Sequence, residues 1–237
     1  MTFVVGVDGC PGGWCCVAIE AKGGRCQVGD PRVYPSFAEA MAASAGVICV
    51  DIPIGLLDRR GQRECDVQAR RLLGKKRGSV FPSPSRAALK ASDYREACDI
   101  NEALTGKRLT IQSFNITPKI RQVDERLSPQ SQGRVLEVHP ELCFWALNAC
   151  SPVMSKKSSV AGRIERWEIL RRYLPALAPS PPPRSELPEG CKRDDYVDAL
   201  VCAWTAICVV RGKAHRIPAQ PESDGCGLRM EMWFPAT

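Results

Sequence analysis

Histidine is scarce in this chain, with two residues in 237, and its 13 cysteines include no C-x-x-C pair. These shortages argue against a structural zinc site and against a Ser-His-Asp hydrolase. The odd number of cysteines, spread through expected strands and helices, favours reduced thiols that serve as small apolar residues. We therefore expect a cytoplasmic protein.

Long hydrophobic runs and familiar nucleotide-binding loops are also missing. The longest largely apolar stretch, residues 199–210, is too short for a bilayer, which needs about 20 residues. The N-terminus has no signal-peptide pattern, so neither membrane association nor a cleaved leader is expected. G-x-G-x-x-G, G-x-S-x-G and Walker-type patterns are absent.

An excess of acidic residues is absent too, since the formal net charge is +7. A mildly basic chain permits a polyanionic partner such as nucleic acid. With 44% hydrophobic residues, the chain has enough apolar side chains for a proper core.

The pattern of apolar residues, turns and caps predicts one α/β domain over residues 1–237 with a mixed sheet. The expected strands are 3–8, 13–20, 25–34, 47–55 and 134–140, with a closing strand or extended tail at 226–234. The expected helices are 36–46, 141–149, 158–174 and 193–212. Residues 56–128 are expected to form a largely helical, basic insertion, and the proline-rich residues 175–190 a loop.

Two expected strands end on aspartates, Asp8 and Asp51, each of which closes an otherwise apolar run. A lone buried carboxylate is costly and needs a partner. In the helix expected at 193–212, Asp195 and Asp198 stand at i and i+3 and share one face. A simpler interpretation is that the strand aspartates begin turns and that an aspartate caps the helix.

Taken together, these four aspartates form a set of hard oxygen ligands that suits Mg²⁺ or Mn²⁺. Converging carboxylates repel one another until protons or cations relieve the repulsion. Divalent metals held in this way activate water in phosphodiester cleavage.

Several segments carry a resemblance to a known family: VGVDGCPGGW, VDIPIGL, RECDVQARRLLG, SVFPSP, TPKIRQVD, EVHPEL and DDYVDAL. The chain resembles the domain-of-unknown-function 429 family, which is described as predicted nucleases with a ribonuclease H fold. The resemblance implies a five-stranded mixed sheet of order 3-2-1-4-5, flanked by helices. It also implies that Asp8, Asp51, Asp195 and Asp198 are catalytic metal ligands.

Glu137 and His139 lie two residues apart on the fifth expected strand, close to Asp51 in the implied sheet. Glu137 is a candidate catalytic residue, and His139 a candidate substrate-binding residue. The alternatives are that Glu137 bonds to backbone and that His139 packs before a proline.

A basic segment at 69–86 provides candidate phosphate contacts at Lys75, Lys76, Arg77 and Arg86, and Lys119 of TPKIRQVD joins them. The alternative is a solvated surface. Nucleic acid is the expected partner, and a dimer is allowed. Two other functions stay open: a phosphotransferase or ATPase related to the actin-like fold, and an inactive nucleic-acid-binding module.

Overall fold

The central sheet of the computed structural model, which describes residues 1–236, is built from strands rich in valine, isoleucine and cysteine. Six strands form it: β1 Thr2–Cys10, β2 Gly13–Lys22, β3 Arg25–Val28, β4 Arg32–Tyr34, β5 Val47–Val50 and β6 Val135–Glu137. Their order is β3-β2-β1-β5-β6, and β4 also pairs with β2. The first strands are antiparallel neighbours, whereas β1, β5 and β6 run parallel.

The mixed α/β sheet is confirmed, but three expected strands have clearly different bounds, and the fifth, expected at 134–140, is the shorter β6. The third expected strand, 25–34, is divided into β3 and β4, because Pro31 lacks the N–H that would continue the ladder. The fourth ends at Val50 rather than at residue 55, because Pro53 and the positive φ of Gly55 (76°) turn the chain away from the sheet.

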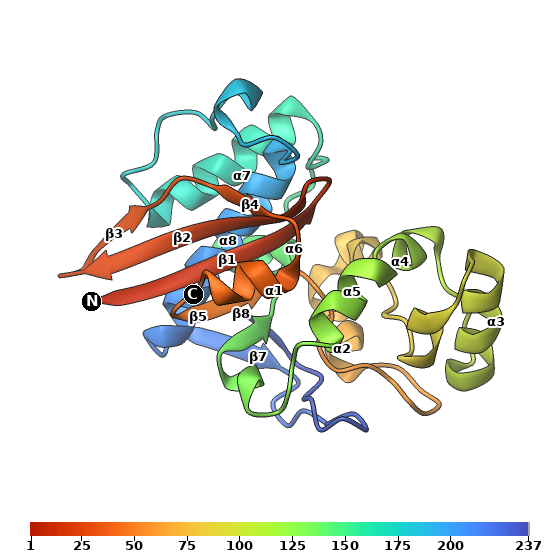
Figure 1. Cartoon of the computed structure of the whole chain (residues 1–237). Coiled ribbons are helices and arrows are strands. Elements are labelled where there is room, and N and C mark those ends of the chain that lie inside the picture. The colour runs from red at the N-terminus through yellow and green to blue at the C-terminus, as the bar shows by residue number, and fades with distance from the viewer. Residues whose placement is uncertain (237) are drawn as a thin grey trace.

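Helices cover both faces of the sheet (Figure 1). The α-helices are α1 Phe37–Ala42, α2 Glu64–Leu73, α3 Tyr94–Thr105, α4 Ile111–Asn115, α5 Thr117–Asp124, α6 Pro140–Leu147, α7 Val160–Tyr173 and α8 Arg193–Val210. The short 3₁₀ turns are η1 Gly74–Ser79, η2 Ala87–Lys90, η3 Ser131–Gly133 and η4 Arg184–Glu186. The largely helical insertion, α2 to α5, lies to one side of the sheet (Figure 1).

Helix α8 packs against β1 more closely than a side chain on Gly6 would allow. A Cβ atom on Gly6 would lie 2.0 Å from the carbonyl oxygen of Ala199 and 2.1 Å from the amide nitrogen of Ala203. Helices α6 and α7 lie on the same face as α8, and α1 and α5 cover the opposite face around Trp14. The glycine therefore sets the depth at which α8 meets the sheet.

A small hairpin of β7 Ala214–Ile217 and β8 Met232–Pro235 follows α8. The sequence predicted a strand only near β8, because β7 is four residues long and half exposed. The proline-rich residues 175–190 form the expected loop apart from η4, and Gly12 N–H donates to the Gly190 carbonyl oxygen over 3.0 Å.

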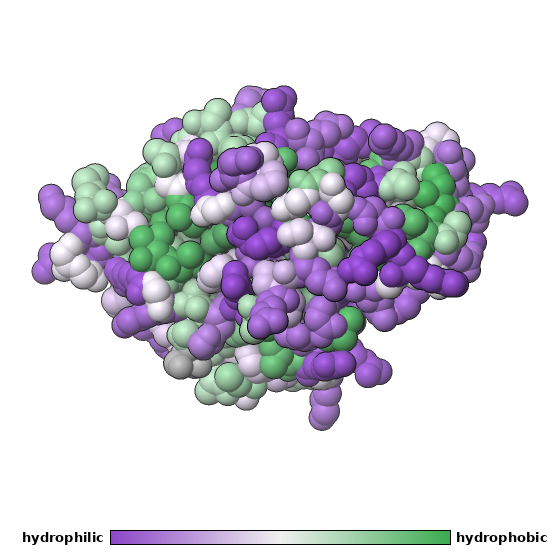
Figure 2. Space-filling view, turned by 90° about the horizontal axis from the view of Figure 1, so that it is seen from below, coloured by the Kyte–Doolittle hydropathy of each residue, from purple (hydrophilic) through white to green (hydrophobic). Residues whose placement is uncertain are grey.

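Hydrophilic side chains cover much of the face drawn in Figure 2, and the hydrophobic areas between them are separate and small. Within the described residues, no helix is both long enough and apolar enough to cross a bilayer.

Candidate functional site

Asp8 and Asp51 lie near each other at one edge of the sheet because they stand near the C-terminal ends of β1 and β5, which are parallel neighbours. Asp8 lies near the end of β1, and Asp51 is the residue after β5, whose partner strand is β1. The Asp51 N–H donates to the Val7 carbonyl oxygen over 3.0 Å, which fixes Asp51 beside the end of β1. Asp8 is buried and Asp51 is partly buried.

Asp198 reaches this edge from α8. Its neighbour Ala199 is the residue whose carbonyl oxygen lies over Gly6, two positions before Asp8 on the same face of β1. The side chain of Asp198 is only 2% exposed. Close packing of α8 on Gly6 therefore brings a third carboxylate to the strand ends, and we call Asp8, Asp51 and Asp198 the aspartate cluster.

The pKa shifts of the aspartate cluster record both burial and mutual repulsion. Burial raises the pKa of Asp8 well above its ordinary value, and the charges of Asp51 and Asp198 raise it further. Burial raises the pKa of Asp51 to about 6, while His139 and Lys157 oppose the shift. Burial also raises the pKa of Asp198, against the stabilising charge of Lys157. Burial is therefore the main cause of the raised pKa values, and the charges of neighbouring carboxylates add to it.

Two lysines border the aspartate cluster. Lys157, in the loop before α7, places its ammonium 2.8 Å from Asp198 Oδ2. Lys119 of α5 donates to the Gly13 carbonyl oxygen, and its ammonium lies 4.9 Å from the centre of the Trp14 ring. Burial lowers the pKa of Lys119, and the nearby Asp8 opposes that shift. The sequence pointed to Lys119 but missed Lys157, which has no periodic or motif signal.

Glu141 and Arg166 form a second ion pair at the edge of the cluster, with 2.5 Å between Arg166 Nη2 and Glu141 Oε1. Glu141 raises the pKa of Asp51 and Asp198, so its carboxylate adds to the negative charge. Glu141 lies within the EVHPEL segment of the family resemblance, and this segment is the sequence signal that could have identified it. Arg166 lies in the middle of α7 and had none.

Asp195 and His139 lie at the margins of the aspartate cluster. Asp195 Oδ2 accepts the backbone N–H of Lys192 over 2.8 Å, and so caps the first turn of α8. Its charge is a minor contributor to the raised pKa of Asp8. His139 lowers the pKa of Asp51, and its Nε2 lies 3.2 Å from the carbonyl oxygen of Ser79.

Glu137 belongs to a different buried cluster. Its carboxylate pairs with the Arg63 guanidinium and accepts the Ile54 N–H over 2.7 Å. Glu137 pairs in register with Val50, whereas His139 directly precedes α6 and its Nε2 lies against the Ser79 carbonyl oxygen, so the two side chains have different partners. Glu137 therefore fixes the turn that follows Asp51 from a position outside the aspartate cluster.

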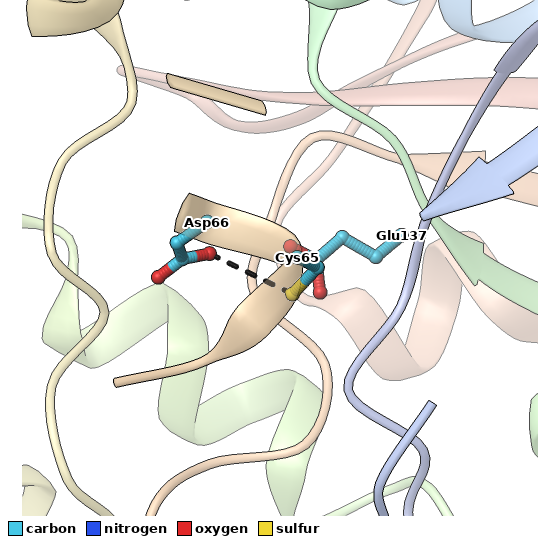
Figure 3. Close-up of side chains that lie close together, drawn as sticks. All are labelled: Cys65, Asp66 and Glu137. Atoms are coloured by element: carbon cyan, nitrogen blue, oxygen red, sulfur yellow. Dashed lines mark hydrogen bonds between the residues drawn. The ribbon is translucent and has the colours of Figure 1, made fainter. Parts of the chain in front are cut away.

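The most compact group of metal-ligand atoms within residues 1–236 is also the one around Glu137. Cys65, Asp66 and Glu137 place their ligand atoms within 4.8 Å of one another, and no other such trio occurs in this part of the chain (Figure 3). Arg63 already pairs with both carboxylates, and burial raises the pKa of the Cys65 thiol. This group is an internal ion-pair network with a protonated thiol, which is a poor metal ligand set.

The basic residues predicted to bind phosphate divide between two environments. Lys75, Lys76 and Arg77 lie on η1. The Lys76 ammonium lies 3.5 Å from the carbonyl oxygen of Ser155, in the loop that carries Lys157. Arg86 instead pairs with Asp124 at 3.0 Å and with Asp224, and so ties the insertion to the chain after α8. We therefore leave Arg86 out of the site.

Removing the charge of Asp51 is expected to change how stability depends on pH in EDTA. The pKa of Asp51 in the folded protein, about 6 against an ordinary 3.8, means that folding favours its protonated form. Wild type should therefore lose stability relative to Asp51→Asn as pH rises from about 4 to 7, by on the order of 2 kcal/mol. Guanidinium unfolding at both pH values measures this, and a pH-independent difference would contradict the raised pKa of Asp51.

Comparison with known proteins gives one match. The family model described as "Protein of unknown function (DUF429)" matches residues 6–223, a range that includes the aspartate cluster and both lysines. Neither the curated proteins nor the solved structures yield a match. Because the matched range covers most of its length, the chain belongs to the DUF429 family of proteins of unknown function.

Proposed function

We propose that this protein is a divalent-metal-dependent nuclease with a ribonuclease H-like fold, in which Asp8, Asp51 and Asp198 hold Mg²⁺ or Mn²⁺. The observation that carries the proposal is that three carboxylates lie near one another at one sheet edge, where burial raises the pKa of each and the charges of Asp51 and Asp198 raise that of Asp8 further. Excess buried negative charge of this kind is relieved by a cation. Oxygen ligands without sulfur favour hard divalent ions.

The arrangement of the elements supports the ribonuclease H-like part of the proposal. An antiparallel pair, β1 and β2, is followed by the parallel strands β5 and β6, and α8 lies across β1. This is the order that the family resemblance implied, apart from the division of the third strand into two.

The chain's own residues would act as follows during hydrolysis. The aspartate cluster would hold the cation, and Lys119 and the η1 lysines would position the phosphate by charge. A divalent ion held there would supply an activated water and stabilise the leaving oxygen. The water would add to phosphorus and give up a proton as the P–O bond to the leaving sugar oxygen breaks, and the sugar oxygen would take up a proton in return. Asp195 remains a candidate fourth ligand.

The direct test is incubation of the protein with labelled single-stranded, duplex, RNA–DNA hybrid and four-way-junction substrates, in Mg²⁺, Mn²⁺ or EDTA. The proposal expects cleavage of at least one substrate with metal and none in EDTA. Binding without cleavage in any metal would favour the inactive binding module, and ATP-dependent phosphate transfer would favour the actin-like alternative.

Neutralising η1 is expected to weaken the salt dependence of nucleic-acid binding. If Lys75, Lys76 and Arg77 contact phosphates, replacing all three by alanine should reduce the log–log slope for a duplex by roughly 2 to 3 units. The matched control removes Lys22, Arg25 and Arg211, which lie at the opposite end of the sheet near the β2–β3 turn. Equal slopes for the two triple variants would mean that η1 is a solvated surface and does not contact phosphates.

A further inference from the structure

Lys157 is the cation placed most directly against the aspartate cluster. Its ammonium lies 2.8 Å from Asp198 Oδ2, and its charge also lowers the pKa of Asp8 and of Asp51. The Asp198 side chain is 2% exposed, whereas that of Lys157 is 50% exposed. The ammonium therefore lies between a buried carboxylate and the solvent.

The loop that carries Lys157 is anchored on both sides. Ser159 Oγ accepts the Gly162 N–H over 3.0 Å and caps α7. Gly162 leaves room for the carbonyl oxygen of Lys156, which would lie 2.0 Å from a Cβ atom at that position. On the other side, Arg166 Nη1 donates to the Ser155 carbonyl oxygen over 3.2 Å. The backbone around Lys157 is thus held by these contacts, and the ammonium is held by Asp198 alone among the cluster.

One ammonium cannot neutralise three carboxylates, of which Asp8 and Asp198 are buried and Asp51 partly buried, and Arg166 is already paired with Glu141. A divalent ion bound by the aspartate cluster would need Asp198, the oxygen donor that Lys157 contacts. Two cations that share one carboxylate repel each other. Metal binding and the Lys157–Asp198 ion pair are therefore in competition.

We propose that Lys157 is an internal counter-cation that holds Asp198 in the metal-free protein and gives it up when a divalent ion binds. The freed ammonium, carried on a side chain that is half exposed, then faces the solvent from which an anionic substrate approaches. The inference rests on the proposed metal site and adds a residue that sets the affinity of that site for the divalent ion.

Calorimetric titration of the full-length protein with MnCl₂ tests this inference. Lys157→Met keeps the length and the apolar stem of the side chain but removes the competing charge. We expect its Mn²⁺ dissociation constant to fall by about tenfold relative to wild type, the size of a modest charge–charge interaction. Lys156→Met is the matched control, because that exposed neighbour contacts none of the three carboxylates, and it should bind Mn²⁺ as wild type does.

The outcomes separate this inference from the proposed function. Equal or weaker Mn²⁺ binding by Lys157→Met, with wild type still binding through Asp8, overturns the counter-cation role and leaves the metal site intact. Absence of Mn²⁺ binding in wild type and both variants overturns the two proposals together. If Lys157→Met folds poorly, Lys157→Gln is titrated in its place, with the same expectation.

Discussion

Replacing Asp8 by asparagine is expected to lower the rate of metal-dependent cleavage by at least about 10²–10³-fold, as loss of one electrostatic stabiliser does in other active sites. Asp8 is the carboxylate whose pKa responds to both other members of the cluster, which makes it the central oxygen donor. Asparagine keeps the shape of the side chain and removes its charge. Initial rates on the best substrate at saturating Mn²⁺ measure the effect.

The matched control for this variant is Asp194→Asn, which removes an aspartate from the first turn of α8 outside the proposed ligands. It should retain activity near that of wild type. Circular dichroism and gel filtration confirm that both variants are folded. Undiminished cleavage by Asp8→Asn, or wild-type cleavage that persists in EDTA, is incompatible with the proposed chemistry.

Gly6→Ala is expected to be strongly destabilising, with a loss of about 3 kcal/mol or more in the free energy of unfolding. The added Cβ atom would meet backbone atoms of α8 at 2.0 and 2.1 Å, and backbone cannot move aside as a flexible side chain can. Any relief requires α8 to retreat from β1, which also carries Asp198 away from Asp8. Surviving protein should therefore have lost Mn²⁺ binding as well.

Gly133→Ala is the control for that substitution, because a Cβ atom on Gly133 meets nothing within 4 Å. Urea unfolding should place it within about 0.5 kcal/mol of wild type. A Gly6→Ala protein with near wild-type stability would mean that the contact between α8 and the sheet is loose, and the positioning of Asp198 would need another cause.

The sequence predicted the parts of the site that depend on local pattern. Asp8 and Asp51 follow apolar strands, and Asp198 precedes the apolar part of a helix, so alternation and helical period were enough to single them out. The close approach at Gly6, which brings Asp198 to the strands, is a tertiary contact that no periodicity reveals.

The cations were harder to predict than the carboxylates. Lys157 and Arg166 lie in an irregular loop and in the middle of a helix, and their roles depend on distances set by the packing of α7. Glu137 shows the opposite error, because its register with Val50 rather than with Asp51 places it outside the aspartate cluster. Residue patterns predict which positions of a helix or strand carry functional side chains. The ends of these elements and the ion pairs between them depend on tertiary packing.

Thermal unfolding of wild type and Asp8→Asn, each in EDTA and in Mn²⁺, tests the central claim that the three aspartates form one metal site. Wild type should melt higher in Mn²⁺, since a ligand at ten times its dissociation constant stabilises the folded state by roughly 1.4 kcal/mol. Asp8→Asn should melt at or above wild type in EDTA, because repulsion is relieved, and should gain little from Mn²⁺. A variant that is clearly destabilised in EDTA and still responds fully to Mn²⁺ would show that Asp8 is only a turn former.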